Sequence, residues 1–242
     1  MTTNNPVALI TGGARGLGRA FAVAFAKAGY RIVLNYSKSE TQAQEAAHEI
    51  RNLGVEALTL RANVSSSEQV NKMMDDVKMR WGRVDVLVNN AGVTHNRTIA
   101  KMTDEEWKNV LNVVLDGPFY CTRAVLPMMR EQKDGVIINI GSYVAEGVRG
   151  AANYAAAKAG VVALTKTTAI EEGRFNIRAN VVLPGFHVTD MNREVYEKLG
   201  ADIMKQHLLG RLSDESEMAE FVVAIAKQKS VTGQVFAYES RV

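Results

Sequence analysis

Short runs of apolar and β-branched residues alternate with longer amphipathic segments along almost the whole chain. The short runs predict strands at Val7–Thr11, Arg31–Tyr36, Ala57–Ala62, Val84–Asn89, Val136–Ile140 and Arg178–Leu183. The longer segments predict helices at Leu17–Ala28, Thr41–Leu53, Glu68–Trp81, Glu105–Arg130 and Tyr154–Glu172. Because several strands are apolar throughout, helices must cover both faces of a parallel sheet. The pattern therefore predicts a doubly wound α/β fold, closed by an edge strand at Gln234–Phe236.

The 242 residues are enough for one large domain or two small ones. No linker, repeat or low-complexity segment interrupts the alternation, so we expect a single domain over residues 1–242. Only the segment from Phe186 to Leu212 breaks the pattern, because it carries no strand. Ligands of open α/β sheets bind outside the carboxyl ends of the strands. We therefore expect residues 186–212 to form a substrate lid, with a surface insertion as the alternative.

The charge balance and the cysteine content narrow the class of protein. The chain carries 29 Lys and Arg against 26 Asp and Glu, and this net charge of +3 is spread along the sequence, so no nucleic acid partner is expected. The single cysteine, Cys121, excludes an internal disulfide framework and a multi-cysteine metal site, and no metal is expected. With no signal-peptide pattern and no apolar run of about 18–20 residues, we expect a soluble cytoplasmic protein.

A glycine-rich turn, Thr11-Gly12-Gly13-Ala14-Arg15-Gly16-Leu17-Gly18, follows the first predicted strand. Glycines at 12, 16 and 18 let the turn be tight and let its backbone approach a pyrophosphate. The helix that begins near Leu17 points its first N–H groups and its positive dipole end at the same phosphates. A turn of this kind between an N-terminal strand and an amphipathic helix predicts a dinucleotide site.

The residues after the second predicted strand indicate which dinucleotide binds. An NAD-preferring site usually places an acid about 20 residues past the glycines, but the first acid here is Glu40. Arg15, Ser37 and Lys38 instead offer cationic and hydroxyl donors that suit a 2′-phosphate. The alternative is that both cations are ordinary solvated surface charges. The pattern favours NADPH.

Tyr154 and Lys158 are four residues apart on a predicted helix and so share one face. A phenol has a pKa of about 10 and is a poor base at neutral pH. A neighbouring ammonium favours the phenolate and brings the group into the working range of an acid–base catalyst. Ser142, at the carboxyl end of a predicted strand, can orient a carbonyl. These three residues are the candidate catalytic set.

Taken together, these motifs resemble the short-chain dehydrogenase/reductase family over essentially the whole chain, and within it the 3-oxoacyl-(acyl-carrier-protein) reductases. The family's motifs occur here in order, as Thr11–Gly18, Asn89–Gly92, the set of Ser142, Tyr154 and Lys158, and Pro184-Gly185 followed by Thr189. The closer likeness rests on Asn153–Gly160 and Pro184–Met191.

The resemblance implies a Rossmann fold and an activity. The reaction would be hydride delivery from NADPH to a ketone, giving a secondary alcohol, with a 3-oxoacyl thioester of acyl carrier protein or CoA as the substrate. Tyr154 would donate the proton to the substrate oxygen, and Ser142 would hold that oxygen. Lys158 would bind the nicotinamide ribose and lower the pKa of Tyr154.

The resemblance also assigns contacts to the cofactor. Asn90 would lie by the adenosine ribose, in the same turn as Ala91 and Gly92. Asn63-Val64 stands where relatives have Asp-Val beside the adenine, and the asparagine carbonyl can still accept a hydrogen bond from the adenine amine. The residues expected to flank the nicotinamide are Pro184, Gly185, Val188 and Thr189.

The sequence departs from the family pattern at the asparagine of the long central helix. Counting seven residues from Trp107, or five back from Phe119, gives the same position, and it holds Val114. Asn112 lies two residues earlier and points about 200° away on a regular helix, so it replaces the missing side chain only if the helix is kinked. In relatives this asparagine orders a water in a proton relay to the lysine, so its absence puts the relay in doubt. The Ser142–Tyr154 spacing is also one residue shorter than usual, which predicts a tightened substrate loop at Tyr143–Ala152.

Other polar residues are given ordinary roles. We expect His48 and His207 on the surface, and His95 and His187 in loops that border the active site. Cys121 is expected to be a small buried hydrophobe rather than a reactive thiol.

Relatives dimerise through the helices that correspond to Glu105–Arg130 and Tyr154–Glu172 and use their C-terminal strand to form a tetramer. The small residues of the second helix allow close self-association, so we expect a homotetramer. If the substrate arrives on an acidic carrier protein, Lys133 and Arg174 are the cations expected nearest the docking face. Two other functions stay open: an alcohol or sugar dehydrogenase of the same family, and a cofactor-binding subunit with weak or no catalysis because of Val114.

Overall fold

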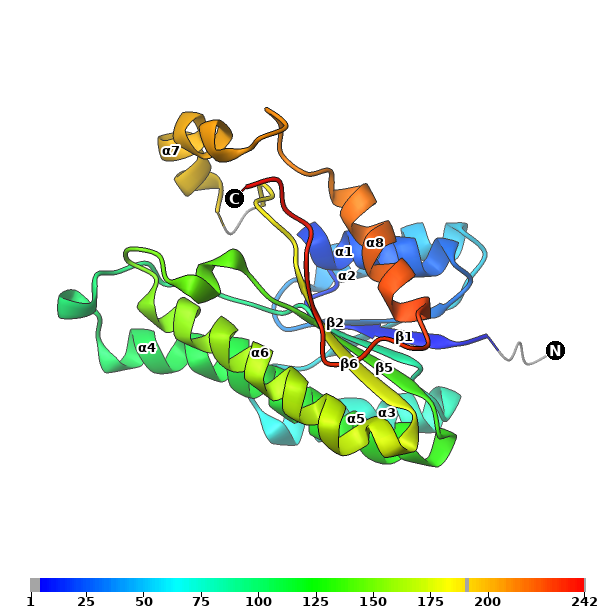
Figure 1. Ribbon diagram of the computed structural model, residues 1–242. Coiled ribbons are helices and arrows are strands. Elements are labelled where there is room, and N and C mark those ends of the chain that lie inside the picture. The colour runs from blue at the N-terminus through cyan, green and yellow to red at the C-terminus, as the bar shows by residue number, and fades with distance from the viewer. Residues whose placement is uncertain (1–4, 190–191, 242) are drawn as a thin grey trace.

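Residues 5–189 and 192–241 are described by the computed structural model shown in Figure 1. Among them, seven strands form one parallel sheet in the order β3-β2-β1-β4-β5-β6-β7. The strands are β1 (Val7–Ile10), β2 (Arg31–Tyr36), β3 (Ala57–Arg61), β4 (Val86–Asn89), β5 (Gly135–Ile140), β6 (Ile177–Leu183) and β7 (Val235–Ala237). The predicted doubly wound α/β fold is confirmed.

Helices lie on both faces of this sheet (Figure 1). One face is covered by α1 (Gly16–Lys27), α2 (Glu40–Asn52) and α8 (Glu215–Lys227), and the other by α3 (Ser67–Trp81), α5 (Gly117–Gln132) and α6 (Ala152–Glu172). α4 (Asp104–Leu111) leads toward α5, and α7 (Arg193–Gln206) stands apart from both layers. Short helical turns lie at η1 (Ile99–Lys101), η2 (Asn112–Asp116), η3 (Tyr143–Glu146) and η4 (Gly173–Phe175).

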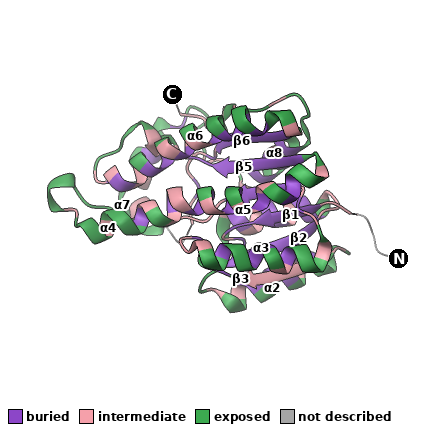
Figure 2. Cartoon of the chain, turned by 90° about the horizontal axis from the view of Figure 1, so that it is seen from below, coloured by how far each residue is buried: buried purple, intermediate pink, exposed green. Residues whose placement is uncertain are grey.

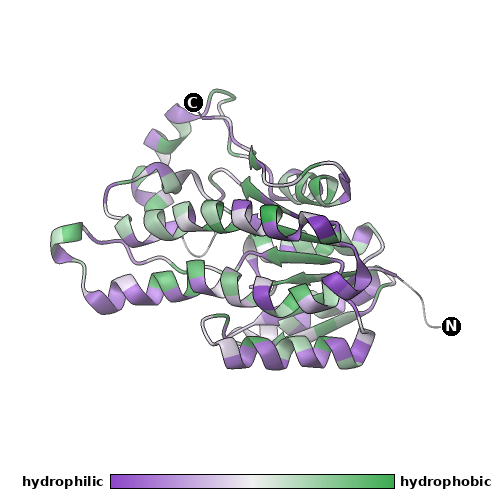
Figure 3. Cartoon of the chain, turned by 60° about the horizontal axis from the view of Figure 1, so that its bottom comes forward, coloured by the Kyte–Doolittle hydropathy of each residue, from purple (hydrophilic) through white to green (hydrophobic). Residues whose placement is uncertain are grey.

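Side chains of the strands alternate between two buried clusters, one on each face of the sheet. The cluster beneath α1, α2 and α8 includes Ile10, Leu34, Val88 and Ile138. The cluster beneath α3 and α5 includes Leu9, Val33, Leu87 and Ile137. Figure 2 shows the buried strands between helices whose outer faces are exposed, and Figure 3 shows the matching change from apolar strands to polar helix surfaces. Because both faces are covered, apolar residues are favoured at successive strand positions, which explains the continuous apolar runs.

The direction of winding changes between β1 and β4. From β1 the chain proceeds outward through β2 to the edge strand β3, and it then crosses back to β4 on the other side of β1. Such a switch opens a crevice outside the carboxyl ends of the strands, and ligands bind there. The turns after β1 and β4 therefore flank the candidate cofactor site.

The prediction of one continuous helix over Glu105–Arg130 is wrong. The segment divides into α4 and α5 around the π-turn η2, in which the N–H of Gly117 bonds the carbonyl of Asn112. Pro118 explains the break, because it has no N–H to donate to the carbonyl four residues earlier, at Val114. The irregular turn therefore falls at the position where the family asparagine is replaced.

The segment 186–212 carries no strand among its described residues, as predicted, and α7 occupies its centre. Asp190 and Met191 lie outside the described residues. Helix α8 was not predicted, although Asp214 caps it by accepting hydrogen bonds from the N–H groups of Ser216 and Glu217. Since this segment follows β6, it leaves the sheet at the edge where the switch-point crevice opens.

Candidate active site

The turn after β1 brings backbone atoms so close together that glycine is required within it. A Cβ atom on Gly18 would lie 2.2 Å from the carbonyl oxygen of Gly12 and 2.6 Å from Nδ2 of Asn90. Gly12 itself has a φ of +65°, which side chains disfavour. Arg15 precedes α1, and its side chain has no acceptor with which to cap the first N–H groups of the helix. The turn thus forms a tight cradle at a helix N-terminus, which fits the pyrophosphate of a dinucleotide.

The turn after β4 is locked to this cradle by Thr11 and Asn90. Oγ1 of Thr11 accepts hydrogen bonds from the backbone N–H of Asn90 at 2.9 Å and of Ala91 at 3.0 Å. Nδ2 of Asn90 donates to the carbonyl oxygen of Thr11 at 2.9 Å. The backbone N–H and the side-chain amide of Asn90 therefore both hold the glycine turn in place. A contact of Asn90 with ribose stays a prediction.

The end of β2 is held to the cradle by Asn35, a buried residue. Its Nδ2 donates to the carbonyl oxygen of Ala62 at 2.9 Å, and its Oδ1 accepts from the N–H of Gly12 at 3.4 Å. Ser37 and Lys38 follow directly and are exposed, as is Arg15. Binding of the cofactor by Arg15, Ser37 and Lys38 stays a prediction, and the buried amide of Asn35, which joins the end of β2 to the glycine turn, was not predicted.

Arg61 is a further cation at this edge that the sequence pattern did not single out. It ends β3 in register with Tyr36, and its Nε donates to the carbonyl oxygen of Ser37 at 3.2 Å. The next turn carries Asn63, whose Oδ1 accepts from the N–H of Ser65 at 3.2 Å. Val64 is buried and packs against Gly117. The predicted adenine contacts thus lie on the turn after β3, beside the edge that carries the cations.

The catalytic candidates come from two adjoining elements, the turn after β5 and the first half of α6. Oγ of Ser142 accepts a hydrogen bond from the N–H of Val144 at 3.2 Å, which leaves its own hydroxyl hydrogen to donate elsewhere. Nζ of Lys158 donates to the carbonyl oxygen of Ile140 at 2.5 Å and lies 5.5 Å from the ring centroid of Tyr154. The lysine thus links the helix of Tyr154 to the strand that ends at Ser142.

Burial dominates the ionisation of this pair. It raises the pKa of Tyr154 to about 12 and lowers the pKa of Lys158 to about 8. Desolvation disfavours both charged forms, and it shifts the pKa of Tyr154 opposite to the direction expected from the family resemblance. A phenol in this state keeps its proton at neutral pH, so Tyr154 is suited to donate it.

Val114 lies in an apolar cluster beneath Tyr154. Its side chain is fully buried with Val110 and Ala157, and Tyr154 packs against the same cluster. Asn112 is exposed. The π-turn therefore does not bring Asn112 into the position of the family asparagine.

Asn153 is a positioning residue whose role the sequence motifs did not indicate. Its fully buried amide donates from Nδ2 to the carbonyl oxygens of Glu106 at 3.1 Å and His95 at 3.2 Å. Its Oδ1 accepts from the N–H of Tyr154 at 2.8 Å. This side chain fixes the first turn of α6 against α4, and the only local signal for it was an amide residue at a helix start.

The turn after β6 brings the remaining predicted contacts to the same crevice. The methyl group of Thr189 would lie 3.6 Å from a Cβ atom on Gly16, so this turn reaches over the glycine cradle. His187 is buried, with Nε2 2.6 Å from the carbonyl oxygen of Pro184, and burial lowers its pKa. His95 is exposed, and the expectation for His207 is wrong, because its side chain is fully buried.

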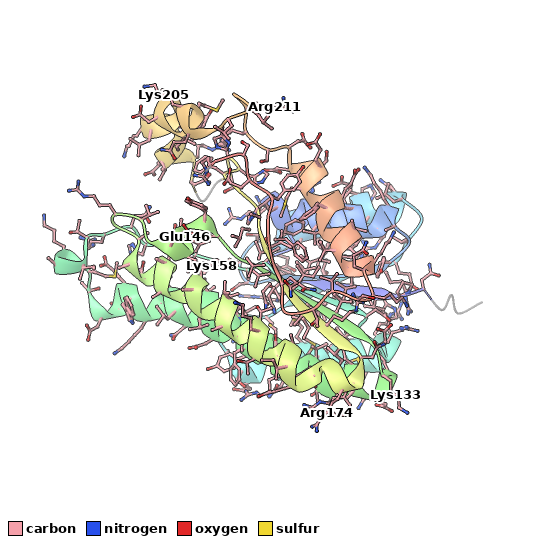
Figure 4. The ribbon with its side chains drawn as sticks, viewed as in Figure 1. Lys133, Glu146, Lys158, Arg174, Lys205 and Arg211 are labelled. Atoms are coloured by element: carbon pink, nitrogen blue, oxygen red, sulfur yellow. The ribbon has the colours of Figure 1, made fainter. Side chains whose placement is uncertain are left out.

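Lys133 and Arg174 do not lie near this site. Figure 4 shows both at the opposite end of α6 from Lys158. Sixteen residues separate Lys158 from Arg174, and that distance along a helix corresponds to about 24 Å. A carrier protein seated on these cations would not face the Ser142 turn of the same chain.

Three comparisons place the chain among known proteins. A family model described as short chain dehydrogenase matches residues 6–200. The chain is 41% identical over 233 residues to the 3-oxoacyl-(acyl-carrier-protein) reductase FabG of Staphylococcus epidermidis, an alignment that covers 95% of this chain and 96% of that protein. It is 40% identical over 235 residues to the 3-oxoacyl-(acyl-carrier-protein) reductase of Synechocystis sp., covering 95% and 94%. The crystal structure of a candidate short-chain alcohol dehydrogenase from Sinorhizobium meliloti matches with a TM-score of 0.92 at 28% identity, covering 97% and 95%.

The chain belongs to the short-chain dehydrogenase family and is an oxidoreductase of Rossmann fold. Membership implies a nicotinamide cofactor, and the glycine cradle fits one, because Gly18 leaves room for backbone but not for a side chain. The resemblance inferred from the motifs is confirmed. None of the helices in the described part of the chain has the length and apolar character needed to span a bilayer.

Proposed function

We propose that the protein reduces a ketone to a secondary alcohol with NADPH, and that its substrate is a 3-oxoacyl thioester of acyl carrier protein or CoA. The observation that carries the proposal is the contact of Lys158 with Ile140 and Tyr154, which places the protonated phenol and the Ser142 hydroxyl on adjoining elements. The two relatives described above are named for this reaction. The identity to them, about 40% over nearly the whole chain, supports the same substrate class.

In this proposal each side chain has one task. The nicotinamide supplies a hydride to the carbonyl carbon when the cofactor is bound. Tyr154 gives its phenolic proton to the substrate oxygen, so that the alcohol leaves neutral. Ser142 donates its free hydroxyl hydrogen to the same oxygen and orients the ketone. Lys158 supplies positive charge beside the phenolate that remains and binds the nicotinamide ribose.

The cofactor contacts are part of the same proposal. Arg15, Ser37 and Lys38 would hold the 2′-phosphate, and their exposure beside the cradle supports this role. Asn63 and Val64 would lie beside the adenine. The other proposed contacts are Gly12, Gly16, Leu17, Gly18, Asn90, Ala91, Gly92, Pro184, Gly185, Val188 and Thr189. Titration with NADPH and NADH tests the preference, and equal affinity would refute it.

We also propose that residues 1–242 form one domain, with 186–212 as its substrate lid, and that the chain forms a homotetramer. The small residues on α6 support close self-association. Lys133 and Arg174 lie at the end of α6 away from Lys158. They could therefore bind a carrier protein only if a second subunit brings its own substrate site to that end. Light scattering tests the oligomeric state, and a monomeric mass would refute this part.

Two other functions are supported by particular observations. The structural match described as a candidate short-chain alcohol dehydrogenase supports oxidation of an alcohol or sugar on the same machinery. The buried Val114 and exposed Asn112 support a cofactor-binding subunit with weak catalysis. Substrate profiling in both directions distinguishes the three.

The decisive test of the reaction is loss of NADPH absorbance with acetoacetyl-CoA, with detection of the 3-hydroxyacyl product. A panel of simple ketones, and of alcohols with NADP, serves as the comparison. Turnover of the thioester above all other substrates is expected. Oxidation of alcohols alone would support the dehydrogenase, and no turnover of any substrate despite NADPH binding would support the weakly catalytic subunit.

A further inference from the structure

The segment Tyr238–Arg241, here called the tail, follows β7 back along the turn that begins at Pro184. The N–H of Tyr238 donates to the carbonyl oxygen of Leu183 at 2.8 Å. A Cβ atom on Gly185 would lie 2.8 Å from the carbonyl oxygen of Tyr238 and 3.2 Å from Oε2 of Glu239. Figure 1 shows this red segment beside the yellow one that leaves β6. The tail is therefore packed directly against the turn proposed to flank the nicotinamide.

The tail also holds the end of the proposed lid. Oγ of Ser240 lies 2.8 Å from Nδ1 of His207, and the carbonyl oxygen of Ser240 accepts from the N–H of Leu208 at 3.0 Å. The His207 side chain is fully buried, and its Nδ1 lies 3.7 Å from Oε1 of Glu239. These contacts fasten the residues that follow α7 to the tail.

On its other side the tail contacts the substrate loop. The guanidinium of Arg241 lies 5.2 Å from the ring centroid of Tyr143, the residue that follows Ser142. The same guanidinium pairs through Nη2 with Oε2 of Glu239. The exposed fractions of the Arg241 and Glu239 side chains are 16% and 4%, so the pair is largely withdrawn from water. The ring of Tyr143 is 37% exposed, so the cation meets the aromatic face at a partly solvated contact.

We propose that Arg241 is a positioning residue, which holds Tyr143 and thereby sets the substrate loop beside Ser142. Glu239 and Ser240 anchor the same tail to the lid, so the two segments that shape the substrate site share one support. The effect of Arg241 on substrate binding rests on the proposed function, whereas its effect on the substrate loop does not. Removal of the guanidinium loosens the residues after Ser142 and weakens binding of the ketone.

The effect on the loop is tested without substrate, by hydrogen exchange of the peptide that covers residues 143–151. Arg241→Ala removes the contact from the tail side, and Tyr143→Leu removes it from the loop side while keeping the Glu239–Arg241 pair. Faster exchange is expected in both variants, with no further increase in the double variant. Exchange equal to wild type in either single variant would overturn the proposal.

The effect on substrate is tested by steady-state kinetics with acetoacetyl-CoA. We expect Arg241→Ala to raise KM about 2- to 5-fold, the range of a partly exposed cation–aromatic contact, with kcat and the Kd of NADPH nearly unchanged. Arg241→Lys keeps a cation over the ring and should restore part of the KM. Arg80→Ala is the matched control, because Arg80 pairs with Glu56 through exposed side chains. A fall in kcat without a change in KM would overturn the positioning role; altered exchange in a protein that reduces no ketone would support it while refuting the proposed function.

Discussion

Lys158 donates a hydrogen bond from Nζ to the carbonyl oxygen of Ile140 at 2.5 Å. Ile140 is the last residue of β5, and Ser142 lies two residues beyond it. Tyr154 lies one helical turn before Lys158, so the bond joins the phenol-bearing helix to the strand that delivers the serine. The lysine thus has a structural task in addition to its charge.

Lys158 makes the stability of the fold depend on pH in a defined direction. Burial lowers its pKa from 10.5 to about 8, so between these values the unfolded chain binds the proton and the folded protein does not. Stability therefore rises with pH through this window and is lost as pH falls to about 8. Relative to Lys158→Met, the wild type should gain about 3 kcal/mol across the window, measured by urea unfolding at several pH values. Parallel curves for the two proteins would contradict the burial of the amine.

The raised pKa of Tyr154 makes the stability of the fold decrease with rising pH, in a window above that of Lys158. Burial raises it from 10.0 to about 12, so the folded protein keeps a proton that the unfolded chain has released. Stability contributed by this group is full below pH 10 and is lost as pH rises toward 12. Tyr154→Phe should flatten the wild-type decline, as followed by unfolding at fixed urea concentration. A decline of equal steepness in both proteins would show that the phenol ionises normally.

Replacement of Val114 tests whether the missing asparagine limits turnover. The side chain is fully buried among apolar groups, so Val114→Asn should cost about 1–3 kcal/mol of stability. If the amide restores a proton relay to Lys158, kcat rises despite that loss, and this is the result we expect. Val114→Thr has nearly the same volume and no amide, and should not raise kcat. A kcat for Val114→Asn equal to that of Val114→Thr would mean that the relay follows another route.

Asn153 should be needed for both the stability and the activity of the site. Its amide satisfies the carbonyls of Glu106 and His95 and the N–H of Tyr154. Asn153→Ala leaves these groups without their partner, and should cost about 2–4 kcal/mol in urea unfolding together with a fall in kcat as Tyr154 shifts. The exposed Asn109 of α4 provides the control, and equal stability of the two alanine variants would contradict this account.

The proposed 2′-phosphate site predicts a selective loss of NADPH affinity. Arg15→Ala and Lys38→Ala each remove a charged donor, and charged hydrogen bonds contribute about 1.5–3 kcal/mol. The Kd of NADPH should therefore rise about 10- to 100-fold, while that of NADH stays nearly constant. Fluorescence titration measures both, and Arg51→Ala serves as the control. Equal losses for the two cofactors would place these cations away from the phosphate.

The parts of the molecule that follow local rules were predictable from sequence. Strand runs such as Val136–Ile140 lie within one or two residues of the observed elements, because burial on both faces selects apolar residues at each position. Gly18 was predicted to lie in a tight turn, and the structure leaves no room for a side chain there. The motif order also placed Tyr154, Lys158 and Ser142 on the elements where they are found.

Features that depend on distant partners were not predictable. His207 was expected on the surface and is buried, because Ser240 and Glu239 cover it from the far end of the chain. The break in the central helix depends on Pro118, which has no N–H to donate. The helical periodicity of the apolar residues continues through this position, so the pattern predicted one unbroken helix. The pKa of Tyr154 follows from desolvation by the packed cluster around it, which spacing along one helix does not reveal.

In the proposed reaction, the Tyr154 phenol supplies the proton for ketone reduction. The most direct measurement is NADPH oxidation with acetoacetyl-CoA by wild type and Tyr154→Phe, with NADPH affinity measured in parallel. We expect kcat to fall at least ~100-fold, the usual contribution of a general acid, with the Kd of NADPH unchanged. A Tyr154→Phe variant that reduces the thioester at the wild-type rate would contradict it.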